Sequence, residues 1–216
     1  MRIKVSSDIL KANDLIAQDI RSILDSARVF CVNILGSPGA GKTTLLEATL
    51  PKLRERYRVA VVQGDVETSI DGERMEALEV PVVQINTQGG CHLSAPMVSG
   101  AIGEFDLTET DVLFIENVGN LVCTASFALG EDAKITALSV TEGDDKVRKY
   151  PTIFLNSKVL VVTKIDLLPH VDFDLEKVER EAKLLNPEIR VVPVSARTGE
   201  GIDEWLALLG KHVASS

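Results

Sequence analysis

The chain has 216 residues, of which 45% are hydrophobic and 25% are charged, so it carries enough apolar material for one sizeable core. Its formal net charge of -9 at pH 7 argues against binding of nucleic acid or an anionic membrane, because phosphate groups are bound by patches of Lys and Arg. The sequence contains neither an apolar signal core at its amino terminus nor the roughly 18 uninterrupted apolar residues that a membrane span needs. We therefore expect a cytoplasmic protein with no nucleic-acid and no membrane partner.

Residues 6–27 carry apolar side chains at roughly helical spacing, which predicts an amphipathic helix ahead of the core. Short apolar runs then alternate with helical patterns. Strands are expected at 29–35, 58–63, 80–86, 111–117, 134–140, 158–166 and 190–195, and helices after Lys42, near Glu73, at 172–185 and around Trp205. This alternation predicts an α/β fold whose mostly parallel sheet is flanked by helices on both faces. Because no internal repeat or long linker is found, we expect a single domain over 1–216, with 1–28 as a helical extension.

The segment GSPGAGKTT, residues 36–44, matches the pattern G-x-x-x-x-G-K-[ST] of a P-loop, the phosphate-binding loop of many NTPases. It follows the apolar run VFCVNIL and opens a helical pattern, which is the context that a P-loop requires. We expect Lys42 to reach the β and γ phosphates and Thr43 to bind Mg²⁺. The alternative is a chance glycine-rich turn with a solvent-facing lysine. Nucleotide contacts are expected from Gly36, Gly39, Ala40, Gly41, Lys42, Thr43 and Thr44.

Acidic residues at the ends of two other predicted strands suit the Mg²⁺ site that phosphoryl transfer needs. In VLFIENVG the strand ends at Glu116 and Gly119 follows, as in the D-x-x-G element of GTPases with Glu in place of Asp. We expect Glu116 to hold Mg²⁺ and the Gly119 N–H to face the γ-phosphate. In VVQGDVETSIDG, Asp65 is the favoured Mg²⁺ residue. Glu67 and Asp71 are weaker candidates, for which a solvated acidic loop is the alternative.

The segment VVTKID predicts which base is bound. Thr163, Lys164 and Asp166 resemble the [N/T]-K-x-D guanine motif, in which the carboxylate accepts hydrogen bonds from two guanine N–H groups and the Lys stem packs along the ring. Downstream, VPVSARTGEG places Ser195 and Ala196 after another strand, as in the S-A element that contacts guanine. A T-K-x-D alone is weak, since a charged strand end with surface ion pairs is common. The four elements in order predict GTP.

A second possible site is found in NTQGGCHLSAP, where Cys91 and His92 follow a predicted strand. Cys123 lies in the segment after Gly119. Thiolate and imidazole ligands suit Ni²⁺ or Zn²⁺. From the residues alone, ordinary thiols without a metal remain the alternative. Cys31, within an apolar strand, is interpreted as a core residue.

The runs GSPGAGKTTLLE, NTQGGCHL, IENVGNLVCTASFALGE, TKIDLLP and SARTGEG together resemble the hydrogenase nickel-incorporation GTPase family, over nearly the whole chain. The resemblance implies an α/β P-loop GTPase that binds GTP, GDP and Mg²⁺, dimerises with nucleotide and helps deliver nickel to the maturing [NiFe] hydrogenase. It also implies a metal site for Ni²⁺ or Zn²⁺ at the dimer contact, formed by Cys91, His92 and Cys123.

Further expectations follow from this resemblance. Intrinsic GTP hydrolysis should be slow, and the partners should be a second copy of the chain, a hydrogenase maturation partner protein and the hydrogenase large subunit precursor. Some members carry a cysteine motif or histidine-rich tract at the amino terminus. The sequence before this P-loop contains neither, which implies an external nickel source.

Three alternatives are compared with this interpretation. The urease-type nickel GTPase family has Cys-Pro-His where this chain has Cys91 followed directly by His92, and has no counterpart to NLVCTASF. A nucleotide-gated interaction module would use GTP as a timer, with incidental cysteines. An ATP-driven partitioning or arsenite-pump enzyme would need a lysine where this chain has Ser37.

Overall fold

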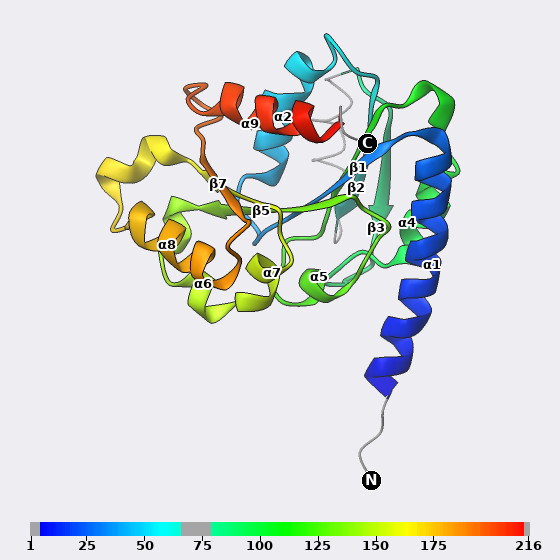
Figure 1. Ribbon diagram of the computed structural model, residues 1–216, viewed down its shortest axis with the longest axis horizontal. Helices are drawn as coiled ribbons and strands as arrows, with labels where there is room; N and C mark the ends of the chain where they lie inside the picture. Colours follow the sequence, from blue (N-terminus) through cyan, green and yellow to red (C-terminus); the bar gives the residue numbers. More distant parts are fainter. Residues whose placement is uncertain (1–4, 66–78, 214–216) are drawn as a thin grey trace.

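The computed structural model describes residues 5–65 and 79–213 (Figure 1). Within these residues, seven strands form one sheet in the order β3-β2-β4-β1-β5-β6-β7. Every strand pairing in the sheet is parallel, which confirms the predicted α/β fold. The strands are β1 Phe30–Leu35, β2 Val59–Asp65, β3 Val82–Asn86, β4 Val112–Glu116, β5 Ala133–Ser139, β6 Val159–Thr163 and β7 Arg190–Pro193.

The described helices are longest at the two chain ends and after the P-loop. They are α1 Val5–Ala27, α2 Lys42–Leu53, α4 Ala95–Ile102, α5 Cys123–Ser126, α6 Lys146–Lys149, α7 Pro151–Leu155, α8 Leu175–Leu185 and α9 Ile202–Val213, with 3-10 turns η1 Leu107–Glu109, η2 Val140–Glu142 and η3 Ile165–His170. The expected helix at 172–185 begins at Leu175, because the Asp174 side chain accepts a hydrogen bond from the Lys177 N–H at 2.9 Å and caps it. The helix expected near Glu73 lies outside the described residues.

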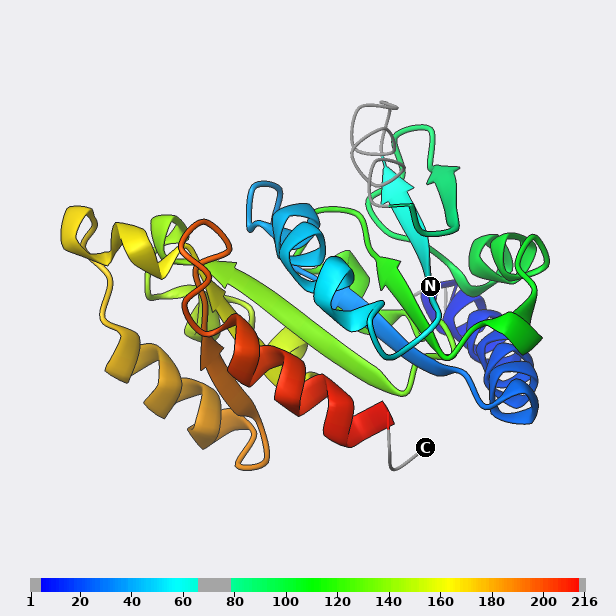
Figure 2. The ribbon, with the colours of Figure 1, turned by 90° about the horizontal axis from the view of Figure 1, so that it is seen from above.

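Alternate residues of β1 face opposite sides of the sheet, and each side is covered by helices (Figures 1 and 2). Phe30, Val32 and Ile34 pack with α2 and α9. On the other side, Cys31 packs with α1 and α4, and Leu35 packs with α7 and α8. Cys31 is fully buried, and burial raises the pKa of its thiol, so it is the core residue that the sequence predicts.

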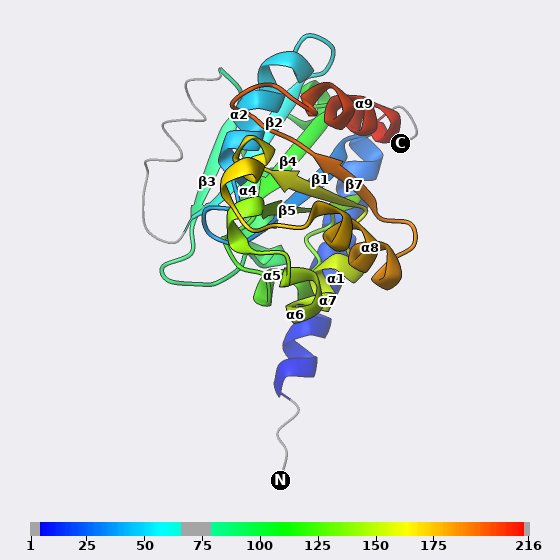
Figure 3. The same cartoon turned by 90° about the vertical axis from the view of Figure 1, so that its left-hand side faces the viewer.

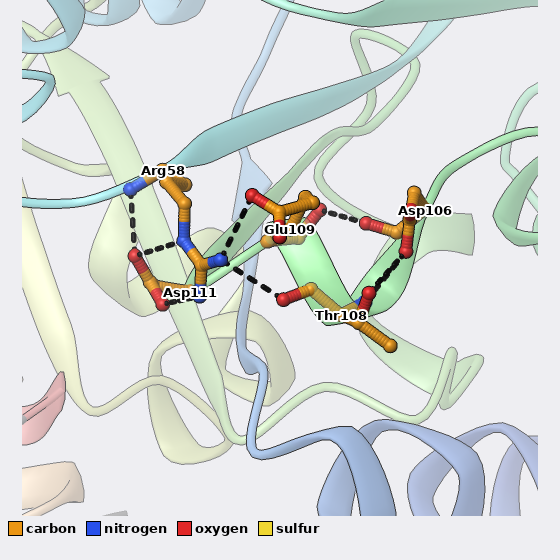
Figure 4. A network of polar contacts seen from close by, with 6 residues as sticks. Arg58, Asp106, Thr108, Glu109 and Asp111 are labelled. Carbon is orange, nitrogen blue, oxygen red and sulfur yellow. Dashed lines mark hydrogen bonds and ion pairs between the residues drawn. The ribbon is translucent and has the colours of Figure 1, made fainter.

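An ion pair joins the residues that directly precede β2 and β4 (Figure 4). It lies at the amino ends of these strands, whereas the P-loop follows the carboxyl end of β1. The Arg58 guanidinium donates from Nε and Nη2 to the two carboxylate oxygens of Asp111, at 3.0 and 2.6 Å. It also donates from Nη1 to Glu109, at 3.1 Å. Hydrogen bonds from Arg58 lower the pKa of Asp111.

The carboxyl ends of the parallel strands lie at one edge of the sheet, and the loops that follow them converge there. The amino-terminal part of α1 extends beyond the body formed by the sheet and its other helices (Figures 1 and 3). None of the helices in the described ranges combines the length and apolar character needed to cross a membrane.

Candidate nucleotide and metal site

The P-loop connects β1 to α2, as its sequence predicts. A side chain on Gly36 would place its Cβ 2.6 Å from the Ala137 carbonyl oxygen, so only glycine fits between the loop and β5. Gly41 precedes α2 with a φ of 85°, a left-handed conformation that favours glycine. The N-cap of α2 makes no side-chain hydrogen bond, and the start of a helix favours an anion such as phosphate.

Lys42, the first residue of α2, is folded back over the P-loop. Its side chain is largely buried, and the Nζ donates to the carbonyl oxygens of Ser37 at 3.2 Å and Gly36 at 3.5 Å. The ammonium group is therefore held inside the ring of loop backbone, where the pattern predicts the β and γ phosphates.

Glu116, at the end of β4, is the centre of a buried polar group beside the P-loop. Its Oε1 accepts a hydrogen bond from the Thr43 hydroxyl at 2.6 Å, and its Oε2 accepts one from the Gln63 amide at 3.1 Å. Asp65 ends β2 two residues beyond Gln63, which pairs with Glu116 across the sheet. The structure thus brings Thr43 and Glu116 together and places Asp65 on the neighbouring strand.

Sequence reasoning missed Gln63, although a polar residue inside the apolar run VAVVQ is a signal of a buried polar contact. Glu67 and Asp71, the weaker acidic candidates, lie outside the described residues.

The segment after Glu116 packs directly on the P-loop. A Cβ on Gly119 would lie 2.7 Å from the Pro38 nitrogen, and the Asn120 N–H donates to the Gly36 carbonyl oxygen at 2.9 Å. Gly119 therefore lies directly against the P-loop, and the expectation that its N–H faces the γ-phosphate stays a prediction.

The predicted base-binding residues, apart from the buried Ser195, line one cavity of about 260 Å³. Thr163 donates through its hydroxyl to the Ala40 carbonyl oxygen at 2.6 Å, and the Lys164 Nζ donates to the Gly39 carbonyl oxygen at 2.7 Å, so the T-K-x-D segment is tied to the P-loop. The Ser195 hydroxyl donates to Asp166 at 2.7 Å. The cavity is lined by Gly41, Thr44, Leu45, Thr163, Lys164, Asp166, Leu167, Val194, Ala196 and Arg197.

Cys91, His92 and Cys123 also come together, from two segments 31 residues or more apart in the chain. One ligand atom from each lies within 4.8 Å of the others, the only such cluster of potential metal ligands in the described ranges. The Cys91 Sγ lies 3.5 Å from the His92 Nδ1, and the His92 ring stacks on Phe127 with ring centroids 3.8 Å apart. Cys91 is exposed, and His92 and Cys123 are half-buried, so the cluster lies at the surface.

The pKa shifts in this cluster favour uncharged side chains, a neutral imidazole at His92 and a protonated thiol at Cys123. A hydrogen bond with Cys91, together with partial burial, raises the pKa of Cys123, and burial lowers the pKa of His92. A lowered pKa favours the neutral form of the His92 imidazole, which is the form that binds a metal. A bound divalent cation would displace the thiol protons and stabilise the resulting thiolates.

Two buried asparagines connect the loops around both sites. The Asn117 Oδ1 accepts from the Leu93 N–H at 3.1 Å, and its Nδ2 donates to Asn33 on β1 at 3.2 Å. Since Asn117 adjoins Glu116 and Leu93 adjoins His92, one side chain links the end of β4 to the Cys91–His92 loop. The sequence did not identify Asn117; an amide directly after an apolar strand was its only signal.

The parallel sheet, the P-loop and the loops that face it define a P-loop nucleotide-binding protein. Residues 30–193 match the family model described as CobW/HypB/UreG, nucleotide-binding domain. The chain is 49% identical over 210 residues to the hydrogenase maturation factor HypB of Azotobacter vinelandii, a match that covers 97% of this chain and 69% of that protein. It therefore belongs to the HypB family of hydrogenase maturation factors.

Two further relatives agree with this assignment. The probable hydrogenase maturation factor HypB of Methanocaldococcus jannaschii is 42% identical over 209 residues, which cover 97% of this chain and 95% of that protein. The crystal structure of HypB from Helicobacter pylori in complex with nickel superimposes with a TM-score of 0.89 at 35% identity, covering 94% of this chain and 96% of that one.

Proposed function

We propose that this protein is a GTP-hydrolysing metallochaperone that helps insert nickel into a maturing [NiFe] hydrogenase. The observation that carries the proposal is the convergence of Cys91, His92 and Cys123 beside a P-loop whose Gly119 segment leads directly to Cys123. The match to HypB from Helicobacter pylori in complex with nickel supports the choice of ion.

Guanine specificity is proposed from the cavity beside Asp166. Its carboxylate would accept hydrogen bonds from the guanine N1–H and exocyclic amine, a donor pair that adenine does not offer. Ser195 supports this role because its hydroxyl donates to Asp166 and orients the carboxylate. The Lys164 stem, tied to the P-loop through Gly39, would pack along the base.

Hydrolysis of GTP to GDP and phosphate is proposed to be slow. Lys42 would neutralise charge on the β and γ phosphates, for which its ammonium group is already held inside the loop. The oxygens of Thr43, Glu116 and Asp65 fit a hard cation, and Mg²⁺ bound there would supply further charge neutralisation. A slow rate would maintain the GTP state long enough for cargo to be bound and delivered.

The cargo site is proposed to respond to nucleotide. Thr43 and Gln63 hold Glu116, and Asn117 then reaches Leu93, next to the Cys91–His92 pair. On the other side, Gly119 packs on Pro38 and leads to Cys123. A change at the P-loop would therefore alter the distance between the two ligand segments. A homodimer, a hydrogenase maturation partner protein and the large subunit precursor are the proposed partners.

The test is a titration of the protein with Ni²⁺ and Zn²⁺ in the presence of GDP and of a non-hydrolysable GTP analogue. Cys91→Ala and Cys123→Ala should lose most of the metal affinity and retain GTP affinity, because neither thiol belongs to the base cavity or the P-loop. Cys31→Ala is the matched control, since it removes a buried thiol that is not one of the three clustered ligands.

Equal metal affinity of the wild type and a variant that carries both Cys91→Ala and Cys123→Ala would contradict the proposal. It would instead favour a nucleotide-gated interaction module in which the cysteines are incidental.

A further inference from the structure

Asn13 lies in the middle of α1 and is buried, with 4% of its surface exposed. Both ends of its amide are used. The Oδ1 accepts a hydrogen bond from the Ala95 N–H at 2.8 Å, and the Nδ2 donates to the Ala128 carbonyl oxygen at 2.8 Å. These partners are 82 and 115 residues away in the chain, so one short side chain joins three distant segments.

Each partner of Asn13 adjoins one half of the Cys91–His92–Cys123 cluster. Ala95 follows His92 by three residues and is the first residue of α4. Ala128 directly follows Phe127, the ring on which His92 stacks, in the segment that begins with Cys123. The Asn13 amide therefore bridges the two segments that supply the ligands.

The contact with Ala95 replaces a missing local cap. A helix leaves its first N–H groups without partners inside the helix, and a side chain at the N-cap position often accepts from one of them. Ser94 occupies that position in α4 and makes no such bond. Asn13 supplies an acceptor at the start of α4 from another helix, so the end of the Cys91–His92 loop depends on where α1 lies.

The position of α1 is in turn held by contacts of its own. The Arg21 guanidinium donates to the Gly130 carbonyl oxygen at 3.1 Å and pairs with Asp132 at 2.5 Å. A Cβ on Gly130 would lie only 2.4 Å from the Cγ2 of Ile20, so the helix packs tightly against this turn. These contacts hold α1, and with it Asn13, against the turn at Gly130.

We propose that Asn13 is a positioning residue of the metal site, which sets the separation between the Cys91–His92 pair and Cys123 without contacting the ion. The inference rests on the proposed metal-binding function. It assigns to α1 a part in cargo binding that the ligand residues alone do not reveal.

The first measurement compares Ni²⁺ and Zn²⁺ affinity in the wild type, Asn13→Leu and Asn13→Ala. Leu retains most of the buried volume and removes both hydrogen bonds, and Ala provides a second variant if Leu does not fold. Loss of an outer residue that orients metal ligands lowers metal affinity about 10- to 100-fold. We expect a loss in that range, with GTP affinity within about twofold of wild type because Asn13 is remote from the base cavity.

Gln18→Ala is the matched control, because it removes an exposed amide from the same helix. It should leave metal affinity unchanged. Thermal unfolding of each variant is measured in parallel. If the Asn13 variants unfold at lower temperature but the folded proteins bind metal like the wild type, Asn13 only stabilises the fold, and the inference is wrong.

A second measurement tests, without a metal ion, whether the Cys91 and Cys123 thiols lie close together. Phenylarsine oxide reacts with two thiols to form two As–S bonds and release one water, which requires two sulfur atoms only a few Å apart. Its affinity for the wild type should exceed that for the Asn13 variants about tenfold or more, in proportion to the loss for Ni²⁺. Equal affinities would contradict the inference.

The arsenical also separates the proposed metal-binding function from the positioning role of Asn13. If Cys91→Ala and Cys123→Ala leave Ni²⁺ and Zn²⁺ binding unchanged, the proposed function fails. A difference in arsenical affinity between wild type and the Asn13 variants would still show that Asn13 positions the thiols.

Discussion

At the scale of single residues, the two sites are connected through amides buried between the loops. Gln63 donates to Glu116, and Asn117 joins Asn33 on β1 to the backbone at Leu93. Buried amides must satisfy several polar atoms at once, so each has few alternative orientations. They restrain the Glu116 carboxylate and the backbone next to the Cys91–His92 pair.

Asp166 offers the most direct residue-scale test of base choice. Asp166→Asn should weaken GTP binding by about 2 to 3 kcal/mol, because the amide replaces one acceptor with a donor that faces the guanine N–H groups. Xanthine nucleotides carry a carbonyl oxygen in place of the exocyclic amine, so the variant should bind them better than the wild type does. Calorimetric titration with both nucleotides measures the change.

Asp172→Asn, an exposed carboxylate beyond η3, serves as the control and should bind GTP like the wild type. Unchanged GTP affinity in Asp166→Asn would remove Asp166 from the base site.

At the scale of elements, the strands are held at both ends by different means. Their carboxyl ends are tied by the loops of the two sites, and the amino ends of β2 and β4 are tied by Arg58 and Asp111 (Figure 4). The Asp111 carboxylate additionally accepts from the Arg58 backbone N–H at 2.8 Å. The ion pair is remote from the P-loop, so it should affect stability and leave nucleotide binding unchanged.

The Arg58–Asp111 pair predicts a pH dependence of stability. Because the pKa of Asp111 is lower in the folded protein than in the unfolded chain, its contribution is present above the unfolded pKa of about 3.9 and is lost as pH falls through the folded pKa. Wild type should therefore be more stable than Asp111→Asn at pH 6, and the difference should shrink as pH falls below about 4. Urea unfolding between pH 6 and pH 2.5 measures it.

Asp19→Asn, at an exposed position of α1, should remain close to wild type across the same range. A difference between wild type and Asp111→Asn that does not vary with pH would show that the charge of Asp111 does not stabilise the fold.

At the scale of the whole molecule, the described residues form one sheet, and both candidate sites lie in the loops at the carboxyl ends of its strands. The prediction of a single domain over residues 1–216, with 1–28 as a helical extension, stays a prediction. Coupling between the sites is expected to be reciprocal: if GTP raises metal affinity, metal must raise GTP affinity by the same factor.

Asn117 provides the test of this coupling, since its side chain joins the end of β4 to Leu93. We expect wild type to bind Ni²⁺ with different affinities in its GDP and GTP-analogue states, and Asn117→Ala to bring the ratio of the two affinities toward one. Titrations in both states, with molecular mass measured alongside, report metal and dimer together. Asn186→Ala, which removes an asparagine that bonds backbone far from either site, should preserve the ratio.

If the wild type binds Ni²⁺ with the same affinity in both nucleotide states, the predicted coupling between the sites is wrong. An unchanged ratio in Asn117→Ala would assign it to another route, such as the contact between Gly119 and Pro38.

Comparison of the expected and observed strands and helices shows which parts of the fold could be predicted. The strands were found because each is a short apolar run between polar segments, and the described strands overlap the expected ranges. Helix α4, by contrast, was not predicted: it has eight residues, and its cap comes from Asn13 in another helix. A signal that lies 82 residues away cannot be recognised from local sequence.

The sequence by itself determined the P-loop, the guanine motif and the strand order along the chain, because each depends on neighbouring residues and on the spacing of apolar side chains. From the residues alone, Cys91, His92 and Cys123 were a possible metal site with ordinary thiols as the alternative, and the resemblance to a family then favoured them as ligands. The tertiary structure decided which polar groups meet. Strand β4 lies between β2 and β1, and this arrangement brings Gln63 to Glu116 and Asn33 to Asn117. Contacts of this kind depend on the packing of the whole sheet with its helices, which no periodicity in the chain specifies.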